Sequence, residues 1–420
     1  MEIQIHRGLK EIGGNCIELN NESSRILLDF GMPLMRPGGE QFADTELANP
    51  TIENGVLPDI EGVYYWQKPS VDAVIFSHHH IDHVGLLPFI HPDIPVYISA
   101  ASLEILRAYS IFTSHLDFLS KASNIKTFVP FKEFEIKGIE ITPLLTDHSA
   151  FDACSLVIRE AGTGSTLFYS GDLRKHGRKG KLIGLAEKLY ADKIDTLLCE
   201  GTQLGRSPSN EDCISEQECE NRLVEVCKES GLVYILCSAS NIDRFVSIYK
   251  SCIKTRRTLV IDLFQLYLLE KLKAFSPALP PHENDLLKVF FLKGHVRALE
   301  DAGETQFLKR AGLRKASLHQ ILTSPAQYCL RLPEKMSRIF AGKLQRHAVA
   351  EISWVYSMWK GYLPELHNWS QAMKTIPGAT SYIHCSGHFH SNDLLDFIKN
   401  INPKQLIPIH TLYPEEMILC

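Results

Sequence analysis

The stretch "AVIFSHHHIDHVGLLP", residues 73–88, places four histidines and one aspartate within six consecutive positions. Its first part is apolar and β-branched, which predicts a short buried strand. Alternate side chains of an extended segment point to the same side, so we expect His78 and His80 to lie together. The residues that follow predict a turn into a helix, with Asp82 and His83 near its start. Four such ligands can serve two metal ions, because a catalytic zinc usually has three protein ligands and one open position. A solvated histidine-rich loop is the alternative interpretation.

The pattern H-x-H-x-D-H resembles the signature of the metallo-β-lactamase fold, a four-layer αββα sandwich. That resemblance implies further site residues at the ends of other strands, and three apolar runs end in them. Asp29 closes "SRILLDFGMP", His148 follows "ITPLL", and Asp172 follows "STLFYSG". By resemblance, one zinc is held by His78, His80 and His148, the second by Asp82 and His83, and Asp172 bridges the two. The resemblance makes Asp29 a residue that orients the ligands.

The stretches "LVYILCSASNIDRFVSIY" and "GLKEIGGNCIEL" resemble segments of ribonuclease J. Two segments near the end resemble motifs of the β-CASP group of nucleic-acid-processing enzymes. They are "HCSGHFH", residues 384–390, and "QLIPIH", residues 405–410. Glu200, which ends "IDTLLCE", matches the group's first motif. We assign the second motif to His388 because it alone follows Ser-Gly, and the third to His410. The resemblance implies that His410 binds the second zinc, that His388 is the general acid, and that Glu200 orients it. The third motif departs from the family, since His410 is followed by "TLYPEE" instead of Gly-Glu.

Substrate phosphates need local positive charge or exposed N–H and O–H groups, even in a chain with a net charge of −5. The basic run "DLRKHGRKGK", residues 172–181, offers Arg174 directly after the bridging aspartate. Ser386 and Gly387 precede the predicted acid, and Ser240 and Asn241 stand at a predicted helix entry. We predict that these five residues contact phosphate. A solvated charged face is the alternative for the basic run.

The spacing of the ligands predicts an inserted domain, because His388 and His410 follow Asp172 only after more than 200 residues. We expect an α/β protein whose metallo-β-lactamase domain spans 1–200 and 366–420, with a β-CASP domain at 201–365. A strand–helix–strand pattern in "LVYILCSASNIDRFVSIYKSCIKTRRTLVIDLF" indicates a parallel sheet in the insert. We expect the substrate in the cleft between the two lobes.

The function predicted from these motifs is zinc-dependent hydrolysis of RNA phosphodiester bonds by a bridging hydroxide on two metal ions. The expected cofactors are two zinc ions, with manganese as an alternative, and the expected partner is single-stranded RNA. The sequence leaves open internal or 5′-exonucleolytic cutting, and a homo-oligomer. The alternatives are a DNA nuclease, a small-molecule hydrolase such as a lactamase, and an inactive binding subunit. In the family, DNA-specific members typically lack a histidine at the third motif, which disfavours the first of these.

Location is predicted from composition. The 11 cysteines form no C-x-x-C pair, and they lie in strand-like runs such as "TLLCEG". Buried thiols in a reducing cytoplasm fit this better than disulfides. The polar start "MEIQIHRGLK" does not resemble a signal peptide, and no apolar run is long enough to span a bilayer. We therefore expect a cytoplasmic protein with no membrane partner.

Overall fold

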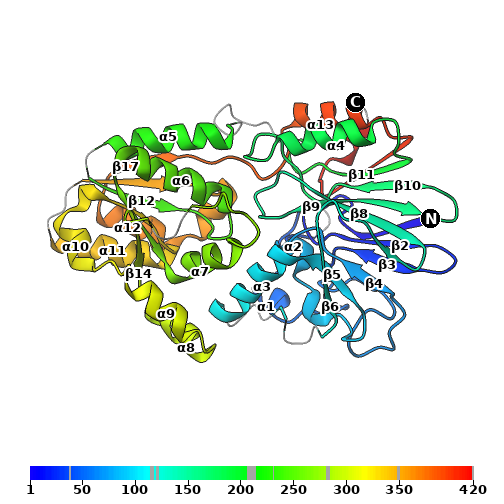
Figure 1. Cartoon of the computed structure of the whole chain (residues 1–420), viewed down its shortest axis with the longest axis horizontal. Coiled ribbons are helices and arrows are strands. Elements are labelled where there is room, and N and C mark those ends of the chain that lie inside the picture. The colour runs from blue at the N-terminus through cyan, green and yellow to red at the C-terminus, as the bar shows by residue number, and fades with distance from the viewer. Residues whose placement is uncertain are drawn as a thin grey trace. The chain divides into compact units, whose positions relative to one another are not determined.

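The computed structural model of the chain describes residues 1–36, 39–113, 118–119, 123–205, 214–229, 231–280, 284–347 and 351–418. The chain divides into two compact units (Figure 1). The first unit is Met1–Pro208 with Gly387–Cys420, and the second is Ser209–Ser386. The predicted domain boundaries at 201 and 366 remain predictions. The second unit extends beyond 366 because α12 (His367–Thr375) and β17 (Ala379–Tyr382) pack on its own sheet.

The first unit contains two sheets, each with six strands among the described residues. In the first sheet the strand order is β1 (Glu2–Arg7), β2 (Cys16–Asn20), β3 (Arg25–Leu28), β4 (Ala73–Ile75), β5 (Val96–Ser99) and β6 (Ile125–Phe128). In the second it is β18 (Gln405–Ile409), β11 (Thr196–Glu200), β10 (Thr166–Tyr169), β9 (Cys154–Glu160), β8 (Ile139–Leu145) and β7 (Phe134–Ile136). Each sheet combines antiparallel pairs at one end with parallel pairs at the other.

Alternating apolar residues explain how the two sheets pack. In β8, Ile139 and Ile141 are buried while the side chains between them are half-buried, the period of two that one buried face requires. These residues join Ile26 and Ile75 of the first sheet in one core cluster. Helices cover the outer faces of the two sheets. The helices that follow strands of the first sheet are α1 (Asp44–Ala48), α2 (Ile81–Val84), η1 (Leu87–Phe89) and α3 (Ala100–Phe112). The helices that accompany the second sheet are α4 (Lys181–Tyr190), α13 (Ser391–Ile401) and α14 (Pro414–Ile418). The result is an αββα sandwich (Figure 1).

The second unit has one sheet whose described strands all pair in parallel, as the strand–helix–strand pattern predicts. The order is β14 (Leu287–Phe290), β13 (Thr258–Asp262), β15 (Tyr328–Arg331), β12 (Leu232–Leu236), β16 (Ile352–Tyr356) and β17. Its other helices are α5 (Glu216–Lys228), α6 (Ile242–Thr255), α7 (Leu263–Leu272), α8 (Lys293–Asp301), α9 (Thr305–Gly312), α10 (Leu318–Thr323), η2 (Pro325–Gln327), α11 (Glu334–Arg346) and η3 (Lys360–Glu365). All five residues of β12 are buried, as expected for a strand covered on both faces.

Two strands of the first unit end in a residue with left-handed backbone geometry. Asp29 follows β3 with φ of 56°, and His410 follows β18 with φ of 51°. Among residues other than glycine, aspartate and histidine adopt this conformation more readily than most. The chain therefore turns sharply at both strand ends and leaves each side chain buried beside the same cluster of histidines. Over the described residues, no helix combines the length and the apolar character that a bilayer crossing requires.

Candidate metal centre and active site

The predicted ligands gather at the carboxyl ends of strands in the first unit. His78 follows β4, His148 follows β8, Asp172 follows β10, and His410 follows β18, while His80 is the N-cap of α2 and Asp82 and His83 lie within that helix. Strands β8, β10, β11 and β18 run in the same direction, so their carboxyl ends meet at one edge of the sheet. Residues that are far apart in the sequence thereby converge.

The side chains form two donor groups that share one carboxylate. The first group is His78, His80, His148 and Asp172, and the second is Asp82, His83, Asp172 and His410. Within each group the potential ligand atoms all lie within 4.8 Å of one another. These are the two sets that the resemblance implied, with Asp172 common to both. Their roles as ligands remain a prediction, because no ion is present.

The distances between donor atoms fit divalent metal ions. Nε2 of His148 lies 3.1 Å from Nδ1 of His80, and Nε2 of His83 lies 3.2 Å from Oδ2 of Asp172. Two ligands of one tetrahedral zinc, each about 2.0–2.1 Å from it, stand roughly 3.3 Å apart. In addition, Nε2 of His78, Nε2 of His83 and Oδ1 of Asp172 are buried without a hydrogen-bond partner. Buried polar atoms without a partner are costly, and one cation in each donor group would satisfy all three.

The second ring nitrogen of each of four histidines is held by a neighbouring oxygen. Nδ1 of His83 lies 2.7 Å from Oδ2 of Asp29, and Nδ1 of His78 lies 3.0 Å from the Ser77 hydroxyl, which itself donates to Asp29. Asp29 also accepts a hydrogen bond from the hydroxyl of Tyr169. Such partners fix the tautomer and the orientation of a histidine and leave Nε2 available as a ligand. Asp29 thus has the position that the resemblance implied.

His410 is oriented by a relay through Thr202. The Thr202 hydroxyl accepts from Nδ1 of His410 at 2.8 Å and donates to Oε2 of Glu200 at 2.7 Å. Nε2 of His410 lies 3.3 Å from Oδ2 of Asp82. His148 is held differently, because its Nδ1 donates to the carbonyl oxygen of Gly387 at 2.6 Å. In both cases Nε2 is directed to the donor groups.

The charge states of the donors suit metal binding. Burial and the neighbouring histidines lower the pKa of His78 well below its usual range, and burial lowers the pKa of His80 to about 4. These imidazoles are therefore neutral at pH 7, the form that ligates a metal. The pKa of Asp172 is also lowered, because the nearby histidines outweigh the effect of burial. For His83, the carboxylates of Asp172, Asp29 and Asp82 outweigh burial and raise the pKa, and the same negative charge attracts a cation.

His388 lies beside these groups and pairs with Glu200. Its Nδ1 lies 3.2 Å from Oε1 of Glu200 and 3.8 Å from Oδ2 of Asp172. Burial lowers the pKa of His388, but the charges of Glu200 and Asp172 outweigh it, so the net shift is upward. The His388 side chain is 21% exposed, whereas those of Asp172 and Glu200 are 1% exposed. His388 is therefore the member of this set that solvent or a substrate can reach.

The residues predicted to contact phosphate have other partners. Arg174 is fully buried, and its Nε donates to Oδ1 of Asp147 at 3.1 Å. This burial and this partner do not favour a phosphate contact by Arg174, which remains a prediction. The run of charges suggested exposure, but the partner carboxylate lies 27 residues earlier in the sequence. The other basic side chains of the run from Lys175 to Lys181 are half-buried or exposed.

The remaining phosphate candidates divide between the two units. Gly387 belongs to the first unit, where its carbonyl holds His148, and a Cβ on it would come within 2.7 Å of the Ser149 hydroxyl. Ser386 ends the second unit. Asn241 caps α6 by accepting from the backbone N–H of Arg244 at 3.0 Å, and the Ser240 hydroxyl lies 3.0 Å from that of Ser238. Phosphate binding by these four residues remains a prediction.

Sequence reasoning missed the residues that hold the ligands in place. Ser77, Thr202 and Tyr169 each donate a hydrogen bond to a carboxylate of the site. A signal existed for two of them, because Ser77 directly precedes His78 and Thr202 follows Glu200 by two positions. No such signal pointed to Tyr169, because it ends an ordinary apolar strand. Its role as a hydrogen-bond donor to Asp29 follows only from its position in the structure.

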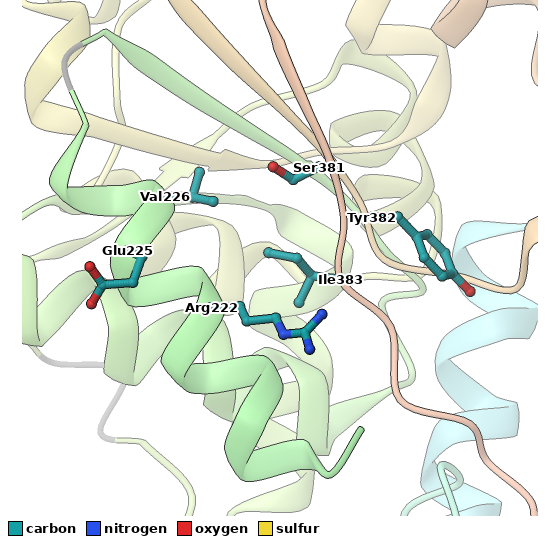
Figure 2. A pocket seen from close by; sticks show the side chains of 6 residues that line it. All are labelled: Arg222, Glu225, Val226, Ser381, Tyr382 and Ile383. Carbon is teal, nitrogen blue, oxygen red and sulfur yellow. The ribbon is translucent and has the colours of Figure 1, made fainter. Parts of the chain in front are cut away.

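A separate pocket lies in the second unit, between α5 and β17 (Figure 2). Its walls are formed by Arg222, Glu225, Val226, Ser381, Tyr382 and Ile383. The one cation among these residues, Arg222, donates to Glu218 on its own helix at 3.0 Å. The pocket wall includes none of the histidines or carboxylates of the candidate metal centre, so it adds nothing to that site.

Comparison with known families agrees with this geometry. The model of the "Metallo-beta-lactamase superfamily" matches residues 9–108, and that of the "Beta-lactamase superfamily domain" matches residues 63–231. Together they cover residues 9–231. Over these residues the chain is similar to the metallo-β-lactamase superfamily. This confirms the resemblance and the fold class predicted from the sequence, and it agrees with the predicted class of enzyme, a metal-dependent hydrolase.

A third family model matches a later segment of the chain. It is described as "Zn-dependent metallo-hydrolase RNA specificity domain" and covers residues 377–416, which include His388 and His410. The chain is also similar to ribonuclease J of Mycobacterium tuberculosis, with 22% identity over 96% of this chain and 67% of that protein. For ribonuclease J of Mycoplasma genitalium the identity is 26%, over 60% of this chain and 42% of that protein. The chain thus spans about two-fifths to two-thirds of the length of these relatives.

Two further relatives extend across nearly the whole chain. The transcription termination factor FttA of Methanothermobacter thermautotrophicus is 23% identical over 98% of this chain and 65% of its own length. A crystal structure of a protein of unknown function from Enterococcus faecalis V583 superposes with a TM-score of 0.77. It is 22% identical and covers 99% of this chain and 95% of its own. At this identity the structural likeness shows a shared fold.

Proposed function

We propose that this protein is a zinc-dependent ribonuclease that hydrolyses phosphodiester bonds in single-stranded RNA. The observation that carries the proposal is the arrangement around Asp172. Two donor groups share this carboxylate, and the Glu200–His388 pair stands beside it. The match to an RNA specificity domain over residues 377–416 and the similarity to ribonuclease J support RNA as the substrate.

The proposed metal sites follow the two donor groups. His78, His80 and His148 hold one ion, Asp82, His83 and His410 hold the other, and Asp172 binds both. When bound, two divalent ions supply Lewis acidity that neutralises phosphate charge and lowers the pKa of a water molecule. The chain's own contribution is to hold each imidazole in the correct orientation through Asp29, Thr202 and Gly387.

His388 is the proposed general acid. Glu200 holds Nδ1 of His388 and, with Asp172, raises its pKa, so the ring is available in its protonated form near neutral pH. A proton on Nε2 then passes to the sugar oxygen that leaves phosphorus. A buried carboxylate in this position also stabilises the imidazolium before the proton is given up.

The location of the proposed enzyme is the cytoplasm. Nine cysteines lie among the described residues, and all nine are buried. Free thiols persist in reducing compartments, which supports this location.

A direct assay tests the proposed function. Purified protein is incubated with matched single-stranded RNA and DNA, each carrying a 5′-monophosphate and a 3′ label, and with a chromogenic lactam. We expect cleavage of RNA, little cleavage of DNA, loss of activity with a strong chelator, and recovery with zinc or manganese. Mononucleotide products indicate 5′-exonuclease action, and longer fragments indicate internal cutting. Equal rates on RNA and DNA, or hydrolysis of the lactam alone, contradict the proposal.

A further inference from the structure

Three cysteine thiols meet inside the second unit, apart from the residues discussed above. Cys227 lies in α5, Cys252 in α6 and Cys329 in β15, and their Sγ atoms all lie within 4.8 Å of one another. All three are free, and their exposed fractions are 2%, 1% and 0%. Val226, the residue before Cys227 in α5, lines the pocket of Figure 2, whereas Cys227 itself is buried. Two helices and one strand thus bring three sulfur atoms together at a place that solvent does not reach.

The spacing of the sulfurs fits a single metal ion. Sulfur ligands lie about 2.3 Å from a zinc ion, so three of them around one ion stand roughly 4 Å apart. The separations of at most 4.8 Å fall within reach of that arrangement after small rotations of the side chains. Soft thiolate ligands select soft cations such as Zn²⁺ and Cu⁺ over Mg²⁺ or Mn²⁺.

A buried positive charge lies beside the cluster. Arg257 is 5% exposed, and its guanidinium donates to the backbone carbonyls of Cys227, Gly231, Glu229 and Tyr328. In the described part of the chain, none of its hydrogen bonds goes to a carboxylate. A buried cation needs compensating negative charge, and thiolates supply it.

The position in the fold indicates a structural role. Cys329 is the second residue of β15, so the cluster lies at the amino end of the parallel strands. In parallel α/β sheets, ligands and substrates bind at the opposite, carboxyl end. Cys227 and Cys252 are close to the carboxyl ends of α5 and α6, the two helices on one face of the sheet. An ion here cross-links two helices and a strand and has no opening to solvent.

We propose that Cys227, Cys252 and Cys329 form a closed structural site for one thiophilic closed-shell cation, Zn²⁺ or Cu⁺. With Zn²⁺ the three thiolates leave one negative charge, which Arg257 balances. With Cu⁺ the three sulfurs complete the coordination without a further ligand. The proposal does not depend on the function assigned to the first unit, where the donors are only imidazole nitrogens and carboxylate oxygens.

That difference in donors provides the test. The full-length protein, reduced and metal-free, is titrated anaerobically with Co²⁺ as a stand-in for Zn²⁺, and separately with Cu⁺. We expect a sulfur-to-cobalt charge-transfer band or the ultraviolet absorption of a copper–thiolate complex, saturating at one ion per chain. Nitrogen and oxygen ligands give neither signal. A saturating cobalt band identifies zinc as the fitting ion, and a signal with copper alone identifies Cu⁺.

Variants assign the signal to these thiols. Cys252→Ser and Cys329→Ser should abolish it and lower the ion content by one, while Cys237→Ser, another buried cysteine of the second unit, should retain it. If the serine variants do not fold, the titration of the wild-type protein still tests whether the thiols bind an ion. Folded wild-type protein with reduced thiols that shows neither signal overturns the proposal, as does a signal that survives in a folded Cys252→Ser, Cys329→Ser double variant.

Discussion

Nδ1 of His388 lies 3.2 Å from Oε1 of Glu200, although 188 positions separate the two residues in the sequence. The backbone N–H of Leu173 donates to the same carboxylate oxygen at 3.1 Å, and Thr202 binds the other. Two neighbours, Leu173 and Thr202, thus fix Glu200 independently of His388. The role that remains for this carboxylate is to orient the imidazole of His388 and to stabilise its protonated form.

The first prediction concerns that imidazole. His388→Ala should reduce RNA cleavage by roughly 10²–10⁴-fold, the usual contribution of a general acid, while metal content stays near that of the wild type. Glu200→Gln should shift the alkaline limb of the pH–rate profile to lower pH, because the charge that raises the pKa of His388 is gone and the general acid loses its proton sooner. His384→Ala is the matched control in the same motif. A larger loss from His384→Ala than from His388→Ala would refute the assignment.

The second prediction concerns the shared carboxylate. Asp172→Ala should lower the content of both ions, since Asp172 belongs to both donor groups. His148→Ala should weaken one site only. Metal content is measured by mass spectrometry after equilibrium dialysis against zinc. Full occupancy of both sites in Asp172→Ala would exclude the two-metal assignment.

The third prediction separates the second site from the first through His410. His410→Ala removes a ligand beside Asp82 and should cost about one ion per chain and most RNA cleavage. The site built from His78, His80 and His148 should stay filled. The wild type should cut RNA much faster than DNA, because a protein that reads RNA can use the 2′-hydroxyl. A His410→Ala protein that keeps both ions would show that the residue is not a ligand.

A fourth prediction addresses Thr202. Thr202→Val keeps the shape of the side chain but breaks the hydroxyl relay between His410 and Glu200. We expect the affinity for the second ion to fall by about 10–100-fold, the usual effect of losing an orienting partner. Thr202→Ser, which retains the hydroxyl, should recover most of it. Equal affinities for Thr202→Val and wild type would mean that the relay does not orient His410.

The fifth prediction concerns acid stability. Although burial raises the pKa of Glu18, hydrogen bonds from His6, Arg25 and Asn20 lower it to about 2. The unfolded value is about 4.3. A depressed folded-state pKa stabilises the protein above the unfolded value, and this stability is lost as pH falls from about 4.5 to 2. Thermal midpoints of Glu18→Gln should therefore be lower than wild type at pH 7, with the difference shrinking toward pH 2. A difference that is constant with pH would contradict this.

The sequence showed where the candidate ligands would gather, because several of them follow an apolar run that predicts a strand end. His78 and Asp172 are examples. Their roles as ligands remain a prediction. The sequence did not predict what Arg174 does, because a run of basic residues cannot reveal that Asp147, far upstream, folds onto one of them. The sequence also could not predict that Gly387 orients His148, since that contact is made by a backbone carbonyl. The sequence of β17 carries no signal of which sheet it joins, so the pairing of β17 with β16 could not be predicted.

The pairing of β11 with β18 has a consequence for biosynthesis. These adjacent strands flank the entire second unit in the sequence, and the backbone N–H of His410 also bonds to the carbonyl of Gly8. During translation, the part of the chain that carries His78 and Asp172 leaves the ribosome long before the part that carries His388 and His410. A nascent or truncated chain that lacks the last strand therefore has neither the proposed acid nor a complete second metal site. The proposed nuclease would become active only when synthesis reaches β18, so a partly made chain would spare the messenger RNA that encodes it.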